Sequence, residues 1–278
     1  TSPHSSFFIF LYQKNLLYYY MKKEYLNLLS NLKEEDRANQ TQNDRILLID
    51  GLNTFIRAFA VNPSQNDDGI HIGGMTGFLL SMGYAIKNIK PSRVIICFDG
   101  KGGSARRRKI FPEYKENRRV RQKLTRSTSL STIEDERISM GQQIQRLVQY
   151  LEVLPVTTMA TENIEADDAI AYITKQVYPD SNCIIMSTDK DFLQLVSKRV
   201  QVWSPTKKRF YFPETIQEEY GIPAHNFLMY RMLKGDGSDN IPGIKGAGIK
   251  TLQRRLPILF EDKAISVEDV ITYANNSD

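Results

Sequence analysis

The sequence contains little cysteine and little histidine, and both shortages limit the chemistry open to it. Among its 278 residues the only cysteines are Cys97 and Cys183, which rules out a disulfide framework and a cysteine-based zinc site. The three histidines, at positions 4, 71 and 225, are too scattered to form a metal-ligand set. We therefore expect a reducing, cytoplasmic setting.

Long hydrophobic runs are also missing. Near the N-terminus the longest one, Phe7–Tyr12, is far shorter than the roughly 20 residues that a membrane span requires. No small-residue cleavage site follows it, so a secretory signal fits poorly, and we expect no membrane partner. Hydrophobic residues at 41% and charged residues at 25% are typical of a globular protein with a buried core.

Residues 1–43 differ in composition from the remainder and are predicted to be an N-terminal extension outside the core, with Met21 as the natural start. From position 44 onward, buried apolar runs alternate with segments of helical spacing. Such alternation predicts an α/β fold with a mostly parallel central sheet flanked by helices. We place this α/β domain at 44–212 and a smaller helical domain at 213–278.

The expected strands are short runs of apolar residues, and the expected helices lie between them. The predicted strands are Ile46–Ile49, Val94–Phe98, Val153–Thr158 and Cys183–Met186, followed by a hairpin of Val200–Trp203 and Arg209–Phe212. The predicted helices of this domain are Met75–Ile89, Ile138–Leu151 and Ala166–Val177.

Acidic residues follow three of the predicted strands. Asp50, Asp99 and Asp189 each come directly after or close to the end of an apolar run, and parallel strands bring such ends to one edge of a sheet. Further carboxylates lie at Glu165, Asp167, Asp168, Asp191, Asp236 and Asp239. Taken singly, an acid at a helix start is explained by capping, and one after a strand by a turn. Together they would repel one another, and oxygen ligands alone indicate Mg²⁺ or Mn²⁺.

Positive charge is concentrated in one segment. Lys101–Arg126 contains eleven basic and two acidic residues, a local charge of +9, whereas the whole chain carries only +5. A basic run is usually a solvated face, but this one also carries Phe111 and Tyr114 and is flanked by Gly102-Gly103. A basic, partly aromatic arm of this kind attracts a phosphate backbone.

A glycine-rich turn, Gly243–Gly248, separates two predicted helices. It misses the nucleotide-binding P-loop pattern because Ile249 intrudes before Lys250 and no buried strand leads into it. Its backbone N–H groups and the following helix start could hold a phosphate without reading sequence. An ordinary helix–helix turn is the alternative for this motif alone.

In combination, these motifs resemble the 5′-nuclease family, which includes flap endonucleases, the 5′-nuclease domain of bacterial DNA polymerase I and phage 5′–3′ exonucleases. The matching strings span about residues 45–255 in the family's order: Ile49–Asn53, Phe98–Gly100, Tyr114–Arg118, Glu165–Asp168, Ser187–Phe192 and Lys234–Gly243. Gln201–Pro205 followed by Lys207-Lys208 further resembles the T-even phage members called ribonuclease H, which remove RNA primers and flaps.

The resemblance implies two bound Mg²⁺ ions, with Mn²⁺ as a substitute. The first ion would be held mainly by Asp50, Asp99, Glu165, Asp167 and Asp168. The second would be held, directly or through water, by Asp189, Asp191, Asp236 and Asp239.

The resemblance also assigns the basic segment and the glycine turn. Residues 101–135 would form a helical arch over the active site, in which Lys115 and Arg118 match catalytic residues that contact the scissile phosphate. The turn would belong to a helix–hairpin–helix element that grips duplex DNA, often with a bound K⁺. The implied DNA-binding residues are Arg106, Arg107, Arg108, Lys109, Tyr114, Arg119, Gly243, Lys245, Gly246, Gly248 and Lys250.

The implied function is that of a structure-specific 5′ nuclease, both 5′–3′ exonuclease and flap endonuclease, which leaves a 5′-phosphate during DNA replication or repair. Its partners would be DNA with 5′ ends or flaps, RNA–DNA hybrids, and a single-strand-binding protein or sliding clamp. We expect a monomer, in the host cytoplasm if phage-encoded. The chain ends 39 residues after Asp239, so we expect an incomplete C-terminal domain.

Three alternatives remain beside this interpretation. A PIN-type endoribonuclease shares the sheet and the aspartates but lacks the basic arm and the glycine hairpin. A non-catalytic nucleic-acid-binding relative would have no use for nine carboxylates, each of which repels phosphate. A haloacid-dehalogenase-like phosphatase requires D-x-D after the first strand, and Asp50-Gly51-Leu52 lacks it.

Overall fold

The computed structural model describes residues 43–119 and 123–276. The predicted N-terminal extension, 1–43, therefore lies outside the described residues except for Asn43. Within the described ranges, no helix has both the length and the apolar composition needed to cross a membrane.

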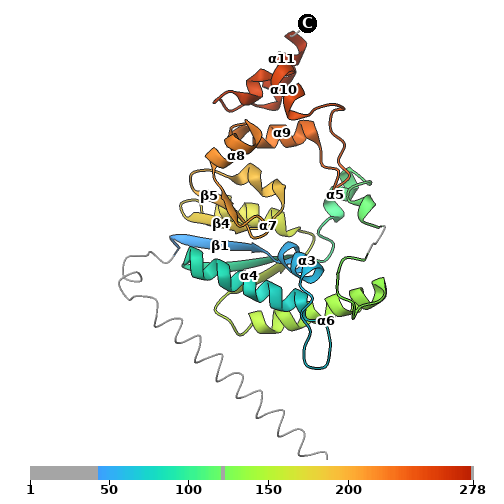
Figure 1. Ribbon diagram of the computed structural model, residues 1–278. Coiled ribbons are helices and arrows are strands. Elements are labelled where there is room, and N and C mark those ends of the chain that lie inside the picture. The colour runs from blue at the N-terminus through green and yellow to red at the C-terminus, as the bar shows by residue number, and fades with distance from the viewer. Residues whose placement is uncertain (1–42, 120–122, 277–278) are drawn as a thin grey trace, which may run out of the picture. The chain divides into compact units, whose positions relative to one another are not determined.

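A six-stranded sheet with the strand order β3-β2-β1-β4-β5-β6 forms the centre of the described unit (Figure 1). The first five strands pair in parallel and β6 pairs antiparallel with β5, which confirms the predicted mixed α/β fold and its hairpin. The strands are β1 (Arg45–Asp50), β2 (Arg93–Asp99), β3 (Thr157–Thr161), β4 (Asn182–Met186), β5 (Val200–Ser204) and β6 (Arg209–Tyr211).

One strand begins later than the sequence predicts. Val153–Thr158 is the expected strand, but β3 starts at Thr157. The backbone N–H groups of Val153, Leu154 and Val156 donate to nearby carbonyls in turns that follow the preceding helix, and Pro155 has no N–H to offer. These residues therefore cannot join the ladder until the turn ends.

Helices lie on both faces of the sheet and extend beyond it. They are α3 (Gly51–Val61), α4 (Gly73–Ile89), α5 (Ala105–Ile110), α6 (Ile133–Leu151), α7 (Ala166–Tyr172), α8 (Pro213–Tyr220), α9 (Phe227–Lys234), α10 (Ile249–Arg255) and α11 (Val267–Asn276). Shorter turns of helix are η1 (Glu116–Arg119), η2 (Ile173–Val177), η3 (Lys190–Leu195), η4 (Ala224–Asn226) and η5 (Pro257–Phe260). Helix α6 begins five residues before its predicted start because Thr132 and Asp135 form a capping box there.

The alternation of side chains along β1 divides the hydrophobic core into two layers. Leu47 and Ile49 face α3, α4 and α6, whereas Ile46 and Leu48 face α7 and the helices after β6. In Figure 1 the helices α4 and α6 lie below the sheet, and α8 and α9 lie above it. Burial on both faces explains why β1 reads as a continuous apolar run.

The helices after β6 share this core. The predicted domain boundary at 212–213 falls between β6 and α8, yet Ile216, Phe227 and Leu252 belong to the same buried cluster as the sheet residues. The segment that carries Asp236, Asp239 and the glycine turn is therefore packed against the body that carries the other carboxylates.

Candidate active site

The carboxyl edge of the sheet collects acidic side chains from several segments. Asp50 is the last residue of β1 and Asp99 the last of β2, and these two strands are direct neighbours. Asp189 follows β4, the neighbour of β1 on its other side, and Glu165 immediately precedes α7. The parallel topology thus brings to one edge the carboxylates that the sequence predicts there.

Some of these carboxylates also organise the local backbone. Asp50 accepts a hydrogen bond from the N–H of Asn53 at 3.2 Å and another from the Ser187 hydroxyl at 3.0 Å. Asp99 accepts from the N–H of Ala166 at 2.7 Å, which ties the end of β2 to the start of α7. Asp50 therefore caps the N-terminus of α3. Glu165 stands at the N-terminus of α7 but makes no capping hydrogen bond there, so capping does not explain its position.

A second acidic group lies beside the first. Asp191 in η3 comes together with Asp236 and Asp239, which follow α9, and one oxygen from each lies within 4.8 Å of the others. The donors are carboxylate oxygens without a thiolate or imidazole, which is the donor set of a hard divalent cation. The residues present therefore fit the predicted Mg²⁺ or Mn²⁺.

Burial makes it costly to ionise this cluster without a counter-charge. Desolvation raises the pKa of Asp50 to about 7, although the hydrogen bonds from Asn53 and Ser187 oppose the rise. Desolvation also raises the pKa of Asp167 to about 6, assisted by the nearby charges of Glu165 and Asp168. Elevated carboxylate pKa values at one edge of a sheet are typical of a site built to receive a cation.

Arginine from the arch supplies part of that counter-charge. Arg107 in α5 forms two hydrogen bonds with Asp168, at 2.7 and 2.8 Å, and an ion pair with Glu165 at 2.9 Å. It lies 3.9 Å from Asp167. This predicted DNA-binding residue therefore pairs with three of the predicted metal ligands.

Lys115 and Arg118 approach the same carboxylates. The Lys115 ammonium lies 2.9 Å from Glu165, and the Arg118 guanidinium contacts Asp239. The expected α-helix over these residues is instead a left-handed residue at Lys115 followed by the 3₁₀ turn η1. The two side chains therefore reach different carboxylates, which Tyr114 links through its hydroxyl.

Tyr114 lies beneath these cations and not on the surface. Its side chain is 4% exposed, and its hydroxyl lies 2.9 Å from Glu165 and 3.1 Å from Asp239. Lys115 adds a backbone hydrogen bond to the carbonyl of Asp239 at 2.8 Å. The arch is thus fastened both to the start of α7 and to the turn after α9, and Tyr114 is placed to join them. Its predicted DNA contact stays a prediction.

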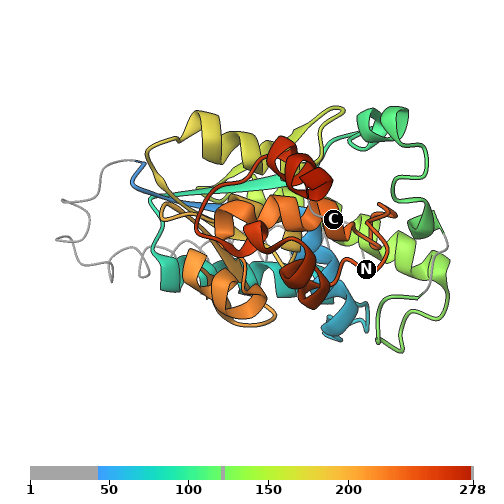
Figure 2. The same ribbon diagram turned by 90° about the horizontal axis from the view of Figure 1, so that it is seen from above.

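The other predicted arch residues are more accessible. Arg106, Arg108 and Lys109 are exposed on α5, and the side chain of Arg119 lies outside the described residues. Figure 2 shows the described parts of the segment running from α5 toward α6 along one side of the unit. For Arg106, Arg108 and Lys109 the predicted role in binding DNA is consistent with this exposure, because exposed cations can meet a phosphate backbone.

The predicted glycine hairpin connects α9 to α10. Gly243 lies against the backbone: a Cβ there would meet the Lys234 carbonyl oxygen at 2.1 Å. Gly246 has a φ of +82°, and Gly246 and Gly248 both face open space. In the described chain, the amides of Lys245, Gly246, Ile249 and Lys250 have no backbone acceptor. The turn therefore presents unpaired donors beside a helix start.

Comparison with known families identifies the chain. Residues 45–221 match the family model described as 5′-3′ exonuclease, N-terminal resolvase-like domain. The chain belongs to this 5′–3′ exonuclease family. The matched range contains the carboxylates from Asp50 to Asp191 and the arch, whereas Asp236, Asp239 and the glycine hairpin lie beyond it.

Individual relatives agree with this assignment. A 5′-3′ exonuclease of Buchnera aphidicola is 33% identical over 216 residues, which cover 77% of this chain and 70% of that protein. DNA polymerase I of Bacillus subtilis is 31% identical over 218 residues, covering 76% of this chain but only 23% of the polymerase. The particular resemblance to T-even phage enzymes stays a prediction.

Solved structures share the fold. A bacteriophage T5 flap endonuclease, in a pseudo-enzyme–product complex with DNA and metal ions, has a TM-score of 0.66 at 23% identity and covers 84% of this chain and 83% of its own. The T5 D15 protein co-crystallised with metal ions has a TM-score of 0.64 at 22% identity and covers 82% of this chain and 78% of its own. At this identity the likeness establishes the 5′–3′ exonuclease fold.

Sequence analysis overlooked two cations at the site of this family member. Arg231 in α9 bridges Asp191 and Asp236, with 2.5 Å to an oxygen of each. Arg57 in α3 lines a pocket of about 220 Å³ beside Asp189. Arg57 is four residues after Asn53, which binds Thr188, so helical spacing could have placed it on the face toward β4. For Arg231 no comparable signal exists: Asp191 is 40 residues away, and Asp236, five residues on, is not at the i+3 or i+4 spacing that shares a helix face.

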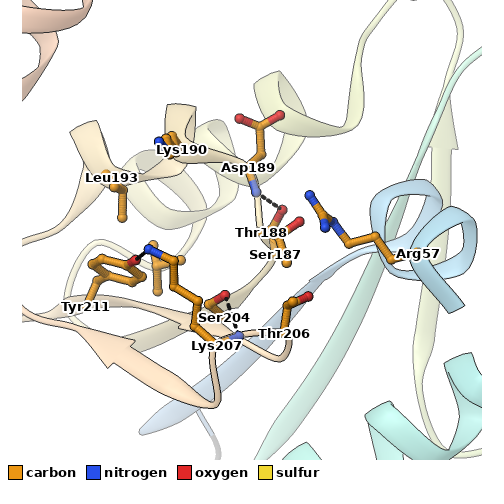
Figure 3. A pocket seen from close by; sticks show the side chains of 11 residues that line it. Arg57, Ser187, Thr188, Asp189, Lys190, Leu193, Ser204, Thr206, Lys207 and Tyr211 are labelled. Atoms are coloured by element: carbon orange, nitrogen blue, oxygen red, sulfur yellow. Dashed lines mark hydrogen bonds between the residues drawn. The ribbon is translucent and has the colours of Figure 1, made fainter. Parts of the chain in front are cut away.

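The pocket beside Asp189 is lined by cations and hydroxyl groups. Figure 3 shows Arg57 directed toward Ser187 and Thr188, with Lys207 on the opposite side. The Lys207 ammonium lies 2.6 Å from the Tyr211 hydroxyl. Arg57, Lys190 and Lys207 therefore bring positive charge next to Asp189, one of the predicted metal ligands.

Proposed function

We propose that this protein is a divalent-metal-dependent, structure-specific 5′ nuclease that hydrolyses phosphodiester bonds and leaves a 5′-phosphate. The family assignment makes it a hydrolase of the 5′–3′ exonuclease family. One observation carries the finer proposal: Lys115 and Arg118, from the arch, meet carboxylates from both acidic groups. Cations that can contact phosphate thus lie directly against residues that can hold metal.

Two groups of carboxylates would each hold one Mg²⁺. The first would be held by Asp50, Asp99, Glu165, Asp167 and Asp168, and the second by Asp189, Asp191, Asp236 and Asp239. When bound, such a pair of ions activates a water and stabilises the leaving oxygen. The close approach of Asp191, Asp236 and Asp239 supports the second group.

Lys115 and Arg118 would have different partners in the metal-free and the metal-bound protein. Lys115 and Arg118 neutralise carboxylates here, and metal binding would remove the need for these ion pairs. The same side chains would then be available to the scissile phosphate and to the charge that develops on it during hydrolysis. Tyr114 supports both by fixing the turn from which they project.

A pH-dependent stability is expected from Asp50. In metal-free protein its pKa of about 7 lies above that of the unfolded chain, so folding binds a proton and the free energy of unfolding falls as pH rises from about 4 to about 7. Asp50→Asn removes this penalty. In EDTA, the variant's melting temperature should exceed the parent's by more at about pH 7.5 than at about pH 5. An equal difference at both values would refute the buried, protonated Asp50.

The glycine hairpin would bind the phosphate backbone of duplex DNA through its unpaired amides, with K⁺ as an additional ligand. Phosphate contacts of this type carry no sequence information and weaken steeply with salt. Lys245 and Lys250 are exposed beside these amides and add positive charge. The placement of the hairpin on the same body as the carboxylates lets one duplex reach both.

Gly248→Ala tests this duplex contact. The backbone at Gly248 has a φ of −77°, which alanine adopts readily, and the added methyl faces open space, so the fold should survive. The methyl would obstruct a close phosphate, and duplex affinity should fall roughly tenfold, about the value of one hydrogen bond to a charged group. Gly83→Ala is the matched control: Gly83 lies in α4, away from the hairpin, and a methyl added there also faces open space. Metal affinity should be unchanged in both variants, and normal duplex binding by Gly248→Ala would make the hairpin merely structural.

The function itself is tested with a 5′-labelled flap substrate, in Mg²⁺ and in EDTA. We expect cleavage near the junction in Mg²⁺, a product with a 5′-phosphate, and no cleavage in EDTA. Cleavage of single-stranded RNA without need for a 5′ end would instead indicate a PIN-type endoribonuclease. Binding without cleavage in Mg²⁺ and Mn²⁺ would indicate a non-catalytic relative. Comparing the cleavage rate of this substrate with that of a matched substrate whose flap is RNA measures the preference between RNA and DNA.

A further inference from the structure

A groove of about 640 Å³ lies between α5, at the base of the arch, and α7. Strand β3 at the edge of the sheet contributes Met159 and Thr161 to its floor. One end of the groove adjoins Asp168, the carboxylate that Arg107 binds. The groove therefore begins at the active site and leads away from it.

Its walls expose apolar and aromatic surface. The side chain of Ile110 is 81% exposed, that of Tyr172 is 63% exposed and that of Ile164 is 38% exposed. Within the described part of the chain, the Tyr172 ring stacks on no other ring and its hydroxyl has no hydrogen-bond partner. A contiguous exposed apolar patch of this kind marks a binding surface more often than a single exposed residue does.

The positive charge at the rim of the groove indicates which kind of ligand it can bind. Arg106 and Arg107 stand on its rim, and of the described residues that line it Asp168 alone is acidic and is already paired with Arg107. An apolar groove with a cationic rim suits a ligand that has flat apolar faces and regularly spaced negative charges. Single-stranded nucleic acid has both, whereas a protein segment would need to supply acidic residues at the rim.

We propose that this groove binds the unpaired 5′ strand of the substrate next to the scissile phosphate, with a base stacked on Tyr172 and a backbone phosphate on Arg106. The proposal rests on the proposed function for the identity of the strand. Base stacking on an aromatic residue tolerates any sequence, as a structure-specific enzyme requires. Ile110 and Met159 would contact the same base from the two walls.

Equilibrium binding in EDTA tests the proposal without using activity. The probes are a duplex that carries an unpaired 5′ strand of roughly eight nucleotides, within the site sizes of single-strand binders, and the same duplex without it. Tyr172→Ala should weaken binding of the first probe by at least roughly fivefold, the lower end of one stacking interaction, and leave the second unchanged. Tyr172→Phe should restore the affinity, since it keeps the ring. Tyr84→Ala, which removes another half-exposed tyrosine on α4, is the control and should change neither.

Arg106→Ala should also weaken the long-strand probe and lower the salt slope of its binding by about 1, the value of one phosphate contact. Equal affinities of parent and Tyr172→Ala for the long-strand probe would overturn the proposal, as would an equal loss on both probes. Failure of the proposed function is seen separately, as absence of cleavage in Mg²⁺ by the parent protein.

Discussion

Asp167→Ala is expected to lower Mg²⁺-dependent cleavage by roughly 10²–10³-fold or more, the scale of losing one group that stabilises developing charge. In the structure Asp167 accepts a hydrogen bond from the N–H of Asp168 at 2.9 Å on one oxygen, and its other oxygen lies 3.9 Å from Arg107. No cation of the described residues contacts it closely, so the carboxylate can still take a metal. Asp50→Ala should have an effect of the same size, because Asp50 is buried at the end of β1 among the other proposed ligands. The measurement is single-turnover cleavage of a 5′-labelled flap at saturating enzyme.

Duplex affinity should persist in both variants or increase, because each carboxylate that is removed no longer repels phosphate. Asp180→Asn is the matched control: it removes an exposed negative charge before the amino end of β4, at the edge of the sheet opposite the cluster. It should cleave at the parent rate. Retained Mg²⁺-dependent turnover in both Asp167→Ala and Asp50→Ala would show that these carboxylates are not the metal ligands.

Lys115→Ala and Arg118→Ala are expected to slow single-turnover cleavage by roughly 10²-fold or more, whereas substrate affinity should change much less. The two side chains lie against Glu165 and Asp239, so they can reach a phosphate that binds between the acidic groups. Many other cations of the arch would share the proposed contacts to the DNA backbone, which should limit the loss of affinity. An interaction that is stronger in the transition state than in the bound substrate lowers the rate more than the affinity.

The decisive measurement is the rate at saturating enzyme. Lys87→Ala, which removes a basic residue from the last turn of α4, controls for the general loss of positive charge. If Lys115→Ala and Arg118→Ala are slow at sub-saturating enzyme but their whole defect disappears when enzyme is saturating, the two residues bind substrate and do not assist the chemistry. The idea would also be falsified if both variants cleaved at the parent rate.

The arch shows how far sequence spacing can be taken. The resemblance implies a helical arch around Lys115 and Arg118, but the structure has a 3₁₀ turn after a left-handed residue there. The contacts that stabilise this turn come from more than a hundred residues away: Asn117 donates to the carbonyl of Gly237, and Asn240 donates to that of Glu113. The pattern of residues within a short segment cannot predict a turn that is stabilised by hydrogen bonds to residues far away in the sequence.

The sequence by itself determined the strands, their parallel arrangement and the carboxylates at their ends. Buried parallel strands require continuous apolar runs, and the residues that leave such strands must gather at one edge, so Asp50, Asp99 and Asp189 could be placed together from order alone. The family motifs extended this placement to Glu165, Asp236 and Asp239.

Only the tertiary structure decided how the charges are paired and which surfaces remain open. Arg231 meets Asp191, and Arg107 meets Asp168, across 40 and 61 residues of chain. The groove at Tyr172 likewise forms only where α5 and α7 come together beside β3. These features depend on packing between distant segments, and periodicity and spacing report only on neighbours along the chain.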